Sequence, residues 1–113
     1  MTKLTHVIKR DGNVVPFTPE RITNAIYRAA VAVDGRDKER AENLSAQVVA
    51  ALEESVPEGE YPTIETIQDM VEKVLIENGH ARVAKAYILY RDERARQRAK
   101  RGDADKTPSG NIP

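Results

Sequence analysis

The sequence predicts a mostly helical protein with a small β part: a four-helix bundle capped by a short β-hairpin or small three-stranded sheet. Two observations predict this fold. An alternating segment around Asp11-Gly12 carries the turn signal of a hairpin. Four amphipathic stretches follow, each bounded by residues that cap or break helices. The 113 residues suit one domain, which we expect over residues 1–101, with a polar, flexible linker over residues 102–113.

The expected hairpin pairs residues 5–10 with residues 13–17. Asp11-Gly12 supplies the positive φ angles of a tight two-residue turn. Pro16 has no N–H to donate, so the second strand should end early. Tyr61 precedes a proline and therefore avoids helical angles, so we expect it to add a short extended piece to the sheet.

The first helix is expected to begin at Thr18-Pro19-Glu20 and to end at Asp34-Gly35. Thr18 can accept hydrogen bonds from the free N–H groups of the first turn, and Glu20 complements the helix dipole. An apolar stripe at helical spacing then indicates the buried face. Its members are Ile22, Ala25, Ile26, Ala29, Ala30 and Val33.

Three further helices are expected. The second spans residues 37–55, and the third is capped by Thr63 and closed by Asn78-Gly79. The fourth begins near His80-Ala81 and becomes strongly charged after Tyr90.

Composition excludes several function classes. The chain has no cysteine, which removes disulfides, thiolate metal sites, thiyl radicals and cysteine nucleophiles. Its 18 basic residues are balanced by 18 acidic residues, so coating of nucleic acid is not expected. No apolar run is long enough to span a membrane, and we expect a cytoplasmic protein that acts on neither membranes nor nucleic acid.

Lys9-Arg10, next to the turn, is the most informative stretch for chemistry. Together with Arg21 and the N-terminus of the first helix, these cations can form a polyphosphate cradle. The alternative is a pair of solvated surface charges, because such pairs are common.

Other polar residues have a structural interpretation beside a functional one. His6 and His80 lack metal-ligand spacing and suit surface or capping roles. Tyr87 and Tyr90 can stack on a base but more often belong to a core. The basic run over residues 91–101 is typical of a solvated helix end. We find no pair of acid and base groups for catalysis.

Three segments resemble the signatures of one family. Residues 7–22 read VIKRDGNVVPFTPERI, residues 67–72 read IQDMVE and residues 84–91 read AKAYILYR. In this order and spacing they resemble the ATP-cone domain of ribonucleotide reductases, and the resemblance extends from residue 3 to about residue 98.

The resemblance implies a site for ATP or dATP beneath the hairpin, with Mg²⁺ accompanying the triphosphate. Phosphate contacts would come from Lys9, Arg10 and Arg21, beside the helix start at Thr18. Val7, Phe17, Ile22 and Ile67 would wall the base or sugar. Gln68 stands where some relatives place a histidine that contacts the nucleotide, and Ile88 and Arg91 are further candidates near the end of the motif.

The implied function is allosteric control of the overall activity of a ribonucleotide reductase, exerted through nucleotide-dependent homo-oligomerisation. The partners would be adenine nucleotides and an attached catalytic domain, since the chain has no catalytic machinery of its own. We favour an adenosylcobalamin-dependent or anaerobic reductase. The alternatives are the ATP-cone of a transcriptional repressor of reductase genes without its zinc ribbon, and a helical bundle that binds no ligand.

Overall fold

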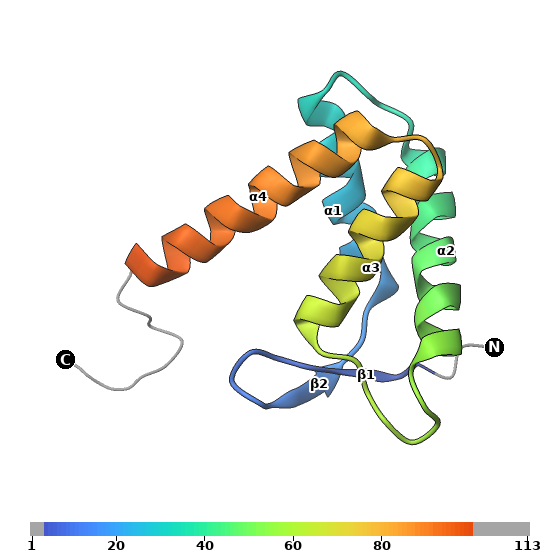
Figure 1. Cartoon of the computed structure of the whole chain (residues 1–113), viewed down its shortest axis with the longest axis vertical. Coiled ribbons are helices and arrows are strands. Elements are labelled where there is room, and N and C mark those ends of the chain that lie inside the picture. The colour runs from blue at the N-terminus through green and yellow to red at the C-terminus, as the bar shows by residue number, and fades with distance from the viewer. Residues whose placement is uncertain (1–3, 101–113) are drawn as a thin grey trace.

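The computed structural model describes residues 4–100 and confirms the mostly helical fold (Figure 1). The linker expected over residues 102–113 lies outside the described residues. The described elements, in chain order, are β1 (His6–Ile8), β2 (Val14–Pro16), α1 (Pro19–Ala32), α2 (Lys38–Ser55), α3 (Ile64–Glu77) and α4 (Ala81–Lys100). None of the described helices is both long enough and apolar enough to cross a membrane.

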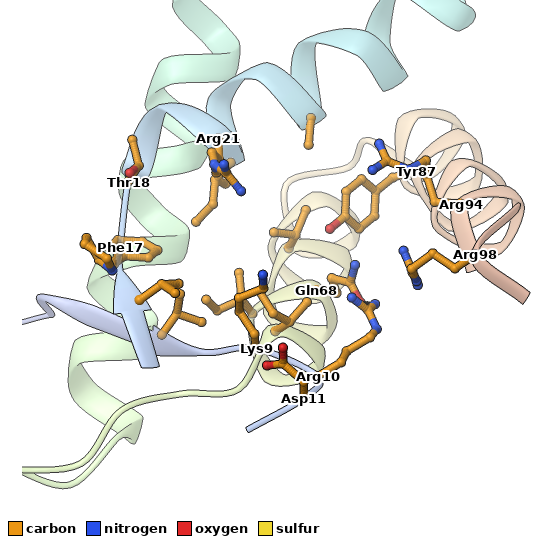
Figure 2. Close-up of a pocket in the computed structure, with 18 residues that line it drawn as sticks. Lys9, Arg10, Asp11, Phe17, Thr18, Arg21, Gln68, Tyr87, Arg94 and Arg98 are labelled. Carbon is orange, nitrogen blue, oxygen red and sulfur yellow. Dashed lines mark hydrogen bonds between the residues drawn. The ribbon is translucent and has the colours of Figure 1, made fainter. Parts of the chain in front are cut away.

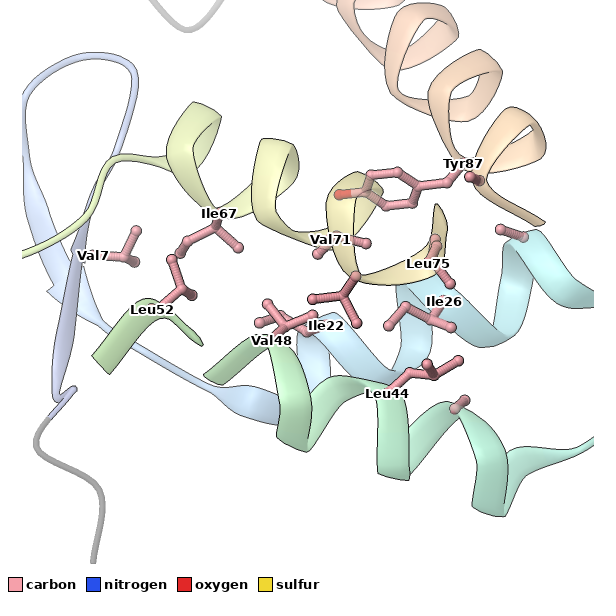
Figure 3. Packing of buried hydrophobic residues seen from close by; sticks show 14 of the residues in the cluster. Val7, Ile22, Ile26, Leu44, Val48, Leu52, Ile67, Val71, Leu75 and Tyr87 are labelled. Carbon is pink, nitrogen blue, oxygen red and sulfur yellow. The ribbon is translucent and has the colours of Figure 1, made fainter. Parts of the chain in front are cut away.

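The helices pack in a ring, in which α1 and α3 each lie between α2 and α4. Branched aliphatic side chains from α1, α2 and α3 fill the centre (Figure 3). Burial of one such side chain stabilises the fold by roughly 1.5–3 kcal/mol. The largest fully buried members are Ile26, Val48, Leu52, Val71 and Leu75.

Helix α4 is held differently from the other three. Only Ala84 and Tyr87 of its 20 residues are buried, and both lie in its first half. Its second half extends past the bundle on the side of the hairpin (Figure 1). Polar contacts must therefore fix the second half of α4.

The hairpin turn has three residues, so the expected two-residue turn is wrong. Val7 pairs with Val15 and Ile8 with Val14, and the Lys9 N–H donates to the Asn13 carbonyl oxygen at 2.8 Å. This register leaves residues 10–12 as the loop. Within this loop only Gly12 has a positive φ, of 90°, whereas a tight two-residue turn of the expected type needs two such residues.

The extended segment expected at Tyr61 is not a third strand, and a single bridge at Thr63 takes its place. The Ile8 N–H donates to the Pro62 carbonyl oxygen at 2.9 Å, and Ile8 forms a parallel bridge with Thr63. Both strands, at three residues each, are also shorter than expected. The bridge nevertheless ties the hairpin to the start of α3.

The helix starts differ in how they are capped. Asp37 and Thr63 cap α2 and α3, accepting from the N–H groups of Arg40 and Thr66. Thr18 makes no side-chain capping bond at the start of α1, which contradicts the cap expected there. A contact from α2 stabilises this helix start instead: the buried Ser45 hydroxyl donates to the Pro19 carbonyl oxygen at 3.3 Å.

The helix ends follow the expected breakers. Asp34, with a φ of 69°, turns the chain after α1, and Gly79, with a φ of 80°, turns it after α3. Because the second turn is short, α4 folds back along α3 and returns toward the hairpin.

Candidate functional site

An open cavity of about 800 Å³ lies between the hairpin, the start of α1, the start of α3 and the second half of α4 (Figure 2). Its volume is within the range of roughly 300–1,000 Å³ found for small-molecule sites. Nine of the residues expected at the site line it. They are Val7, Lys9, Arg10, Phe17, Thr18, Arg21, Ile22, Ile67 and Gln68.

One part of the cavity wall is apolar. Val7, Ile22 and Ile67 are buried side chains of the core cluster, and Phe17 packs against that cluster. Ile64 and Val71 of α3 extend this wall. It is therefore continuous with the core and rigid, as a wall for a flat ring requires.

The other part of the wall is cationic. Lys9 directly follows β1, and its backbone bond to Asn13 continues the pairing, so alternation places its side chain on the same face as Val7, toward the core side of the hairpin. Arg10 belongs to the loop, where alternation ends, and it reaches the cavity from there. Arg21 lies in the first turn of α1, beside the exposed Thr18.

Two arginines of α4 that sequence reasoning left outside the site also line the cavity. Arg94 and Arg98 reach it because the second half of α4 passes over it (Figure 2). Their i, i+4 spacing places both on one face of the helix, but only the direction of α4 shows which face this is.

Positive charge dominates the lining. The five basic side chains are accompanied by one carboxylate, Asp11. Its two oxygens accept hydrogen bonds from the Asn13 backbone and side-chain nitrogens, both at 3.0 Å. Asp11 therefore serves the turn, and the cavity is suited to an anion.

Tyr87 forms part of the cavity floor, a role the sequence left open between core and ligand contact. The side chain is 5% exposed, and its hydroxyl is directed into the cavity (Figure 2). Burial raises the pKa of Tyr87 to about 12, and the Arg91 charge only partly opposes this rise. The hydroxyl thus keeps its proton and can donate a hydrogen bond.

Ile88 and Arg91, also expected at the site, do not line the cavity. Ile88 is 42% exposed on the surface of α4. Arg91 instead binds α3: its Nη1 lies 2.6 Å from Glu72 Oε2 and 3.1 Å from Asp69 Oδ1. Burial alone would lower the pKa of Arg91, but hydrogen bonds to Glu72 and Asp69 raise it above its usual value.

A second polar contact holds α4 against α1. The Tyr90 hydroxyl accepts from Arg94 at 2.9 Å and from Arg28 at 3.1 Å. Partial burial raises the pKa of Tyr90, yet these two hydrogen bonds outweigh burial and lower it. Arg91 and Tyr90 therefore fix the direction in which α4 carries Arg94 to the cavity.

The cavity combines an apolar wall with a cationic one, an arrangement that suits a small anionic ligand with an apolar portion. Among residues 4–100, no group of three or more His, Asp or Glu side chains is placed to hold a metal ion.

Comparison with known proteins identifies the family. The family model of the ATP cone domain matches residues 5–96, and the chain belongs to this family. ATP-cone domains are regulatory domains that bind ATP or dATP as effectors.

Similar curated proteins are ribonucleotide reductases of several kinds. The chain is 44% identical to the vitamin B12-dependent ribonucleoside-diphosphate reductase of Thermoplasma acidophilum over 80% of its own length. It is 41% identical to the anaerobic ribonucleoside-triphosphate reductase of Escherichia coli over 95% of its length. It is 40% identical to the ribonucleoside-diphosphate reductase subunit alpha of Chlamydia trachomatis over 89% of its length. The matches cover 12%, 14% and 11% of these relatives, respectively.

Proposed function

We propose that the cavity binds ATP or dATP and that the chain is the effector domain controlling the overall activity of a ribonucleotide reductase. One observation carries the proposal: an apolar wall and a set of cations face each other across one cavity of an ATP-cone domain. A nucleoside triphosphate has the same two-part character, with a flat base and an anionic tail.

In the proposed complex, Lys9, Arg10 and Arg21 hold the phosphates beside the start of α1. The start of α1 has no side-chain cap, and the positive end of its helix dipole favours an anion there. The base or sugar lies against the apolar wall, where Gln68 and Thr18 supply polar contacts. Mg²⁺ enters as part of the triphosphate complex.

The regulatory part of the proposal requires two arrangements of the domain that bind ATP and dATP with different affinity. We propose that they differ in self-association and that an attached catalytic domain responds to the difference. Exposed Ile88 and Leu89 of α4, 42% and 57% accessible, provide an apolar surface for such contacts.

Titration calorimetry of the chain with ATP, dATP and GTP, each with and without Mg²⁺, tests nucleotide binding. We expect saturable binding of both adenine nucleotides. Heats no larger than those of dilution for ATP and dATP would contradict the proposal and support a bundle without a ligand.

Sedimentation velocity tests the regulatory part. We expect the profiles with saturating ATP and dATP to differ from each other. Identical profiles alone and with either nucleotide would show that the chain does not switch its own assembly, since a ligand that binds two arrangements equally shifts neither.

A further inference from the structure

Arg10 differs from the other two cations of the proposed phosphate site. Its Nε lies 3.2 Å from Glu65 Oε2, and its Nη2 donates to Gln68 Oε1 at 3.4 Å. Within residues 4–100, neither Lys9 nor Arg21 has an ion-pair partner. Arg10 alone among the three is therefore engaged by a carboxylate of the protein itself.

The backbone holds this carboxylate in place. Glu65 lies in the first turn of α3, where its charge suits the helix dipole and the Thr63 cap fixes the helix start. The hairpin that carries Arg10 is joined to this same point by the Ile8–Pro62 hydrogen bond of 2.9 Å. Arg10 and Glu65 are thus brought together by two adjoining segments, and Glu65 itself does not line the cavity.

Carboxylate and phosphate compete for the same donors of a guanidinium group. The Arg10 and Glu65 side chains keep 39% and 50% of their exposure, so water screens the pair and it can be exchanged. A phosphate in the cavity would therefore have to draw the Arg10 guanidinium away from Glu65, and the nearby carboxylate would also repel it.

We propose that Glu65 is an internal competitor for phosphate, which holds Arg10 against α3 and lowers the affinity of the site for nucleoside triphosphates. The inference rests on the proposed function, that the cavity binds ATP or dATP. Binding of a triphosphate exchanges the Arg10–Glu65 pair for an Arg10–phosphate pair and releases the hairpin tip from α3. A nucleoside without phosphates leaves the pair intact.

The test compares Glu65→Gln with the wild-type chain by titration calorimetry, using ATP and adenosine. Glutamine keeps the size of the side chain and removes its charge. We expect ATP to bind roughly threefold to tenfold more tightly, because an exposed ion pair and a nearby like charge each contribute a few-fold. Adenosine binding should be unchanged.

Glu77→Gln is the matched control. Glu77 is an exposed carboxylate on the same helix, about 18 Å away at a rise of 1.5 Å per residue. Its loss should change ATP affinity less than twofold. Melting curves of both variants should confirm that they remain folded.

A double-mutant cycle with Arg10→Gln separates competition from general repulsion. In the Arg10→Gln background, the gain from Glu65→Gln should fall below twofold. An equal gain in both backgrounds would show that Glu65 acts only as a distant charge and would overturn the proposal. Weaker ATP binding by Glu65→Gln, with or without Mg²⁺, would show that Glu65 helps to bind the ligand and would also overturn it.

The two proposals fail in different ways. Normal ATP binding by the wild-type chain together with unchanged binding by Glu65→Gln would reject the competitor role alone. Absence of ATP binding by the wild-type chain and every variant would reject nucleotide binding, and the competitor role with it.

Discussion

The contact between Arg91 and Glu72 should act as a tether that positions α4, and its removal should weaken both the fold and the site. Arg91 Nη1 and Glu72 Oε2 are 2.6 Å apart, and the two side chains retain only 25% and 21% of their exposure. A hydrogen bond between charged groups contributes roughly 1.5–3 kcal/mol when buried, and the remaining exposure reduces this to about 1–2 kcal/mol.

Arg91→Gln and Glu72→Gln should therefore each lower Tm, by about 4–8 °C for every kcal/mol in a domain of this size. The double variant should be little worse than Arg91→Gln alone, because both substitutions remove the Arg91–Glu72 contact and the second partner of Arg91, Asp69, is 70% exposed and contributes little. Urea denaturation followed by circular dichroism provides the free energies of unfolding. Arg96→Gln is the control, since the Arg96–Asp92 pair on the same helix is exposed at 65% and 57% and should contribute less than about 0.5 kcal/mol.

Nucleotide affinity separates a tether from a direct ligand contact. If Arg91 acts only through α4, both variants should weaken ATP binding to a similar extent by misplacing Arg94 and Arg98. Loss of affinity in Arg91→Gln with normal affinity in Glu72→Gln would mean that Arg91 touches the nucleotide. Melting of Glu72→Gln within 2 °C of the wild-type chain would refute the tether.

Two other substitutions test the site. Lys9→Ala should weaken ATP binding about tenfold to a hundredfold, because it removes a charge-assisted contact of roughly 1.5–3 kcal/mol, and it should change Tm little. Titration calorimetry tests this, with substitution of the exposed Lys73, Lys73→Ala, as the control. A Lys9→Ala variant that unfolds would show a structural role instead. Tyr87→Phe should lose less stability at alkaline pH than the wild-type chain does. The folded-state pKa of Tyr87 is about 12, against 10.0 for an unperturbed tyrosine. The protonated hydroxyl therefore stabilises the fold below pH 10, and this contribution is lost as the pH rises toward 12. The loss in free energy of unfolding is on the order of 2–3 kcal/mol. If the denaturation midpoints of both proteins fell equally between neutral pH and pH 11.5, the prediction would be wrong.

The four helices could be predicted from the sequence because their signals are local, and nine of the eighteen lining residues could be predicted from the family resemblance. Helix periodicity around Ile22 and Ile26, the Thr63 cap and the Asn78-Gly79 stop each depend on a few neighbouring residues. The resemblance of residues 7–22 to a family signature placed Lys9, Arg10 and Arg21 at one site, and the structure brings them to one cavity.

Local signals were insufficient where a choice depended on register or on a partner distant in sequence. Asp11-Gly12 indicated a turn, but the pairing of Ile8 with Val14 decided that the loop has three residues. Thr18 has a good capping side chain, yet it makes no capping bond. Backbone pairing across the hairpin, and contacts from α2, determine the geometry at these two points.

The sequence by itself determined that the chain forms a hairpin and four helices, because turn residues and apolar periodicity act within a few positions. Only the tertiary structure decided which charges meet. The chain is neutral overall, with 18 basic and 18 acidic residues, yet five cations and one carboxylate line the cavity. Arg91 forms an ion pair with Glu72, whereas Arg94 and Arg98 line the cavity. Neighbours on one helix differ in this way because the direction of α4, fixed by its packed first half and by the polar contacts of Tyr90 and Arg91, selects the surface that each side chain faces.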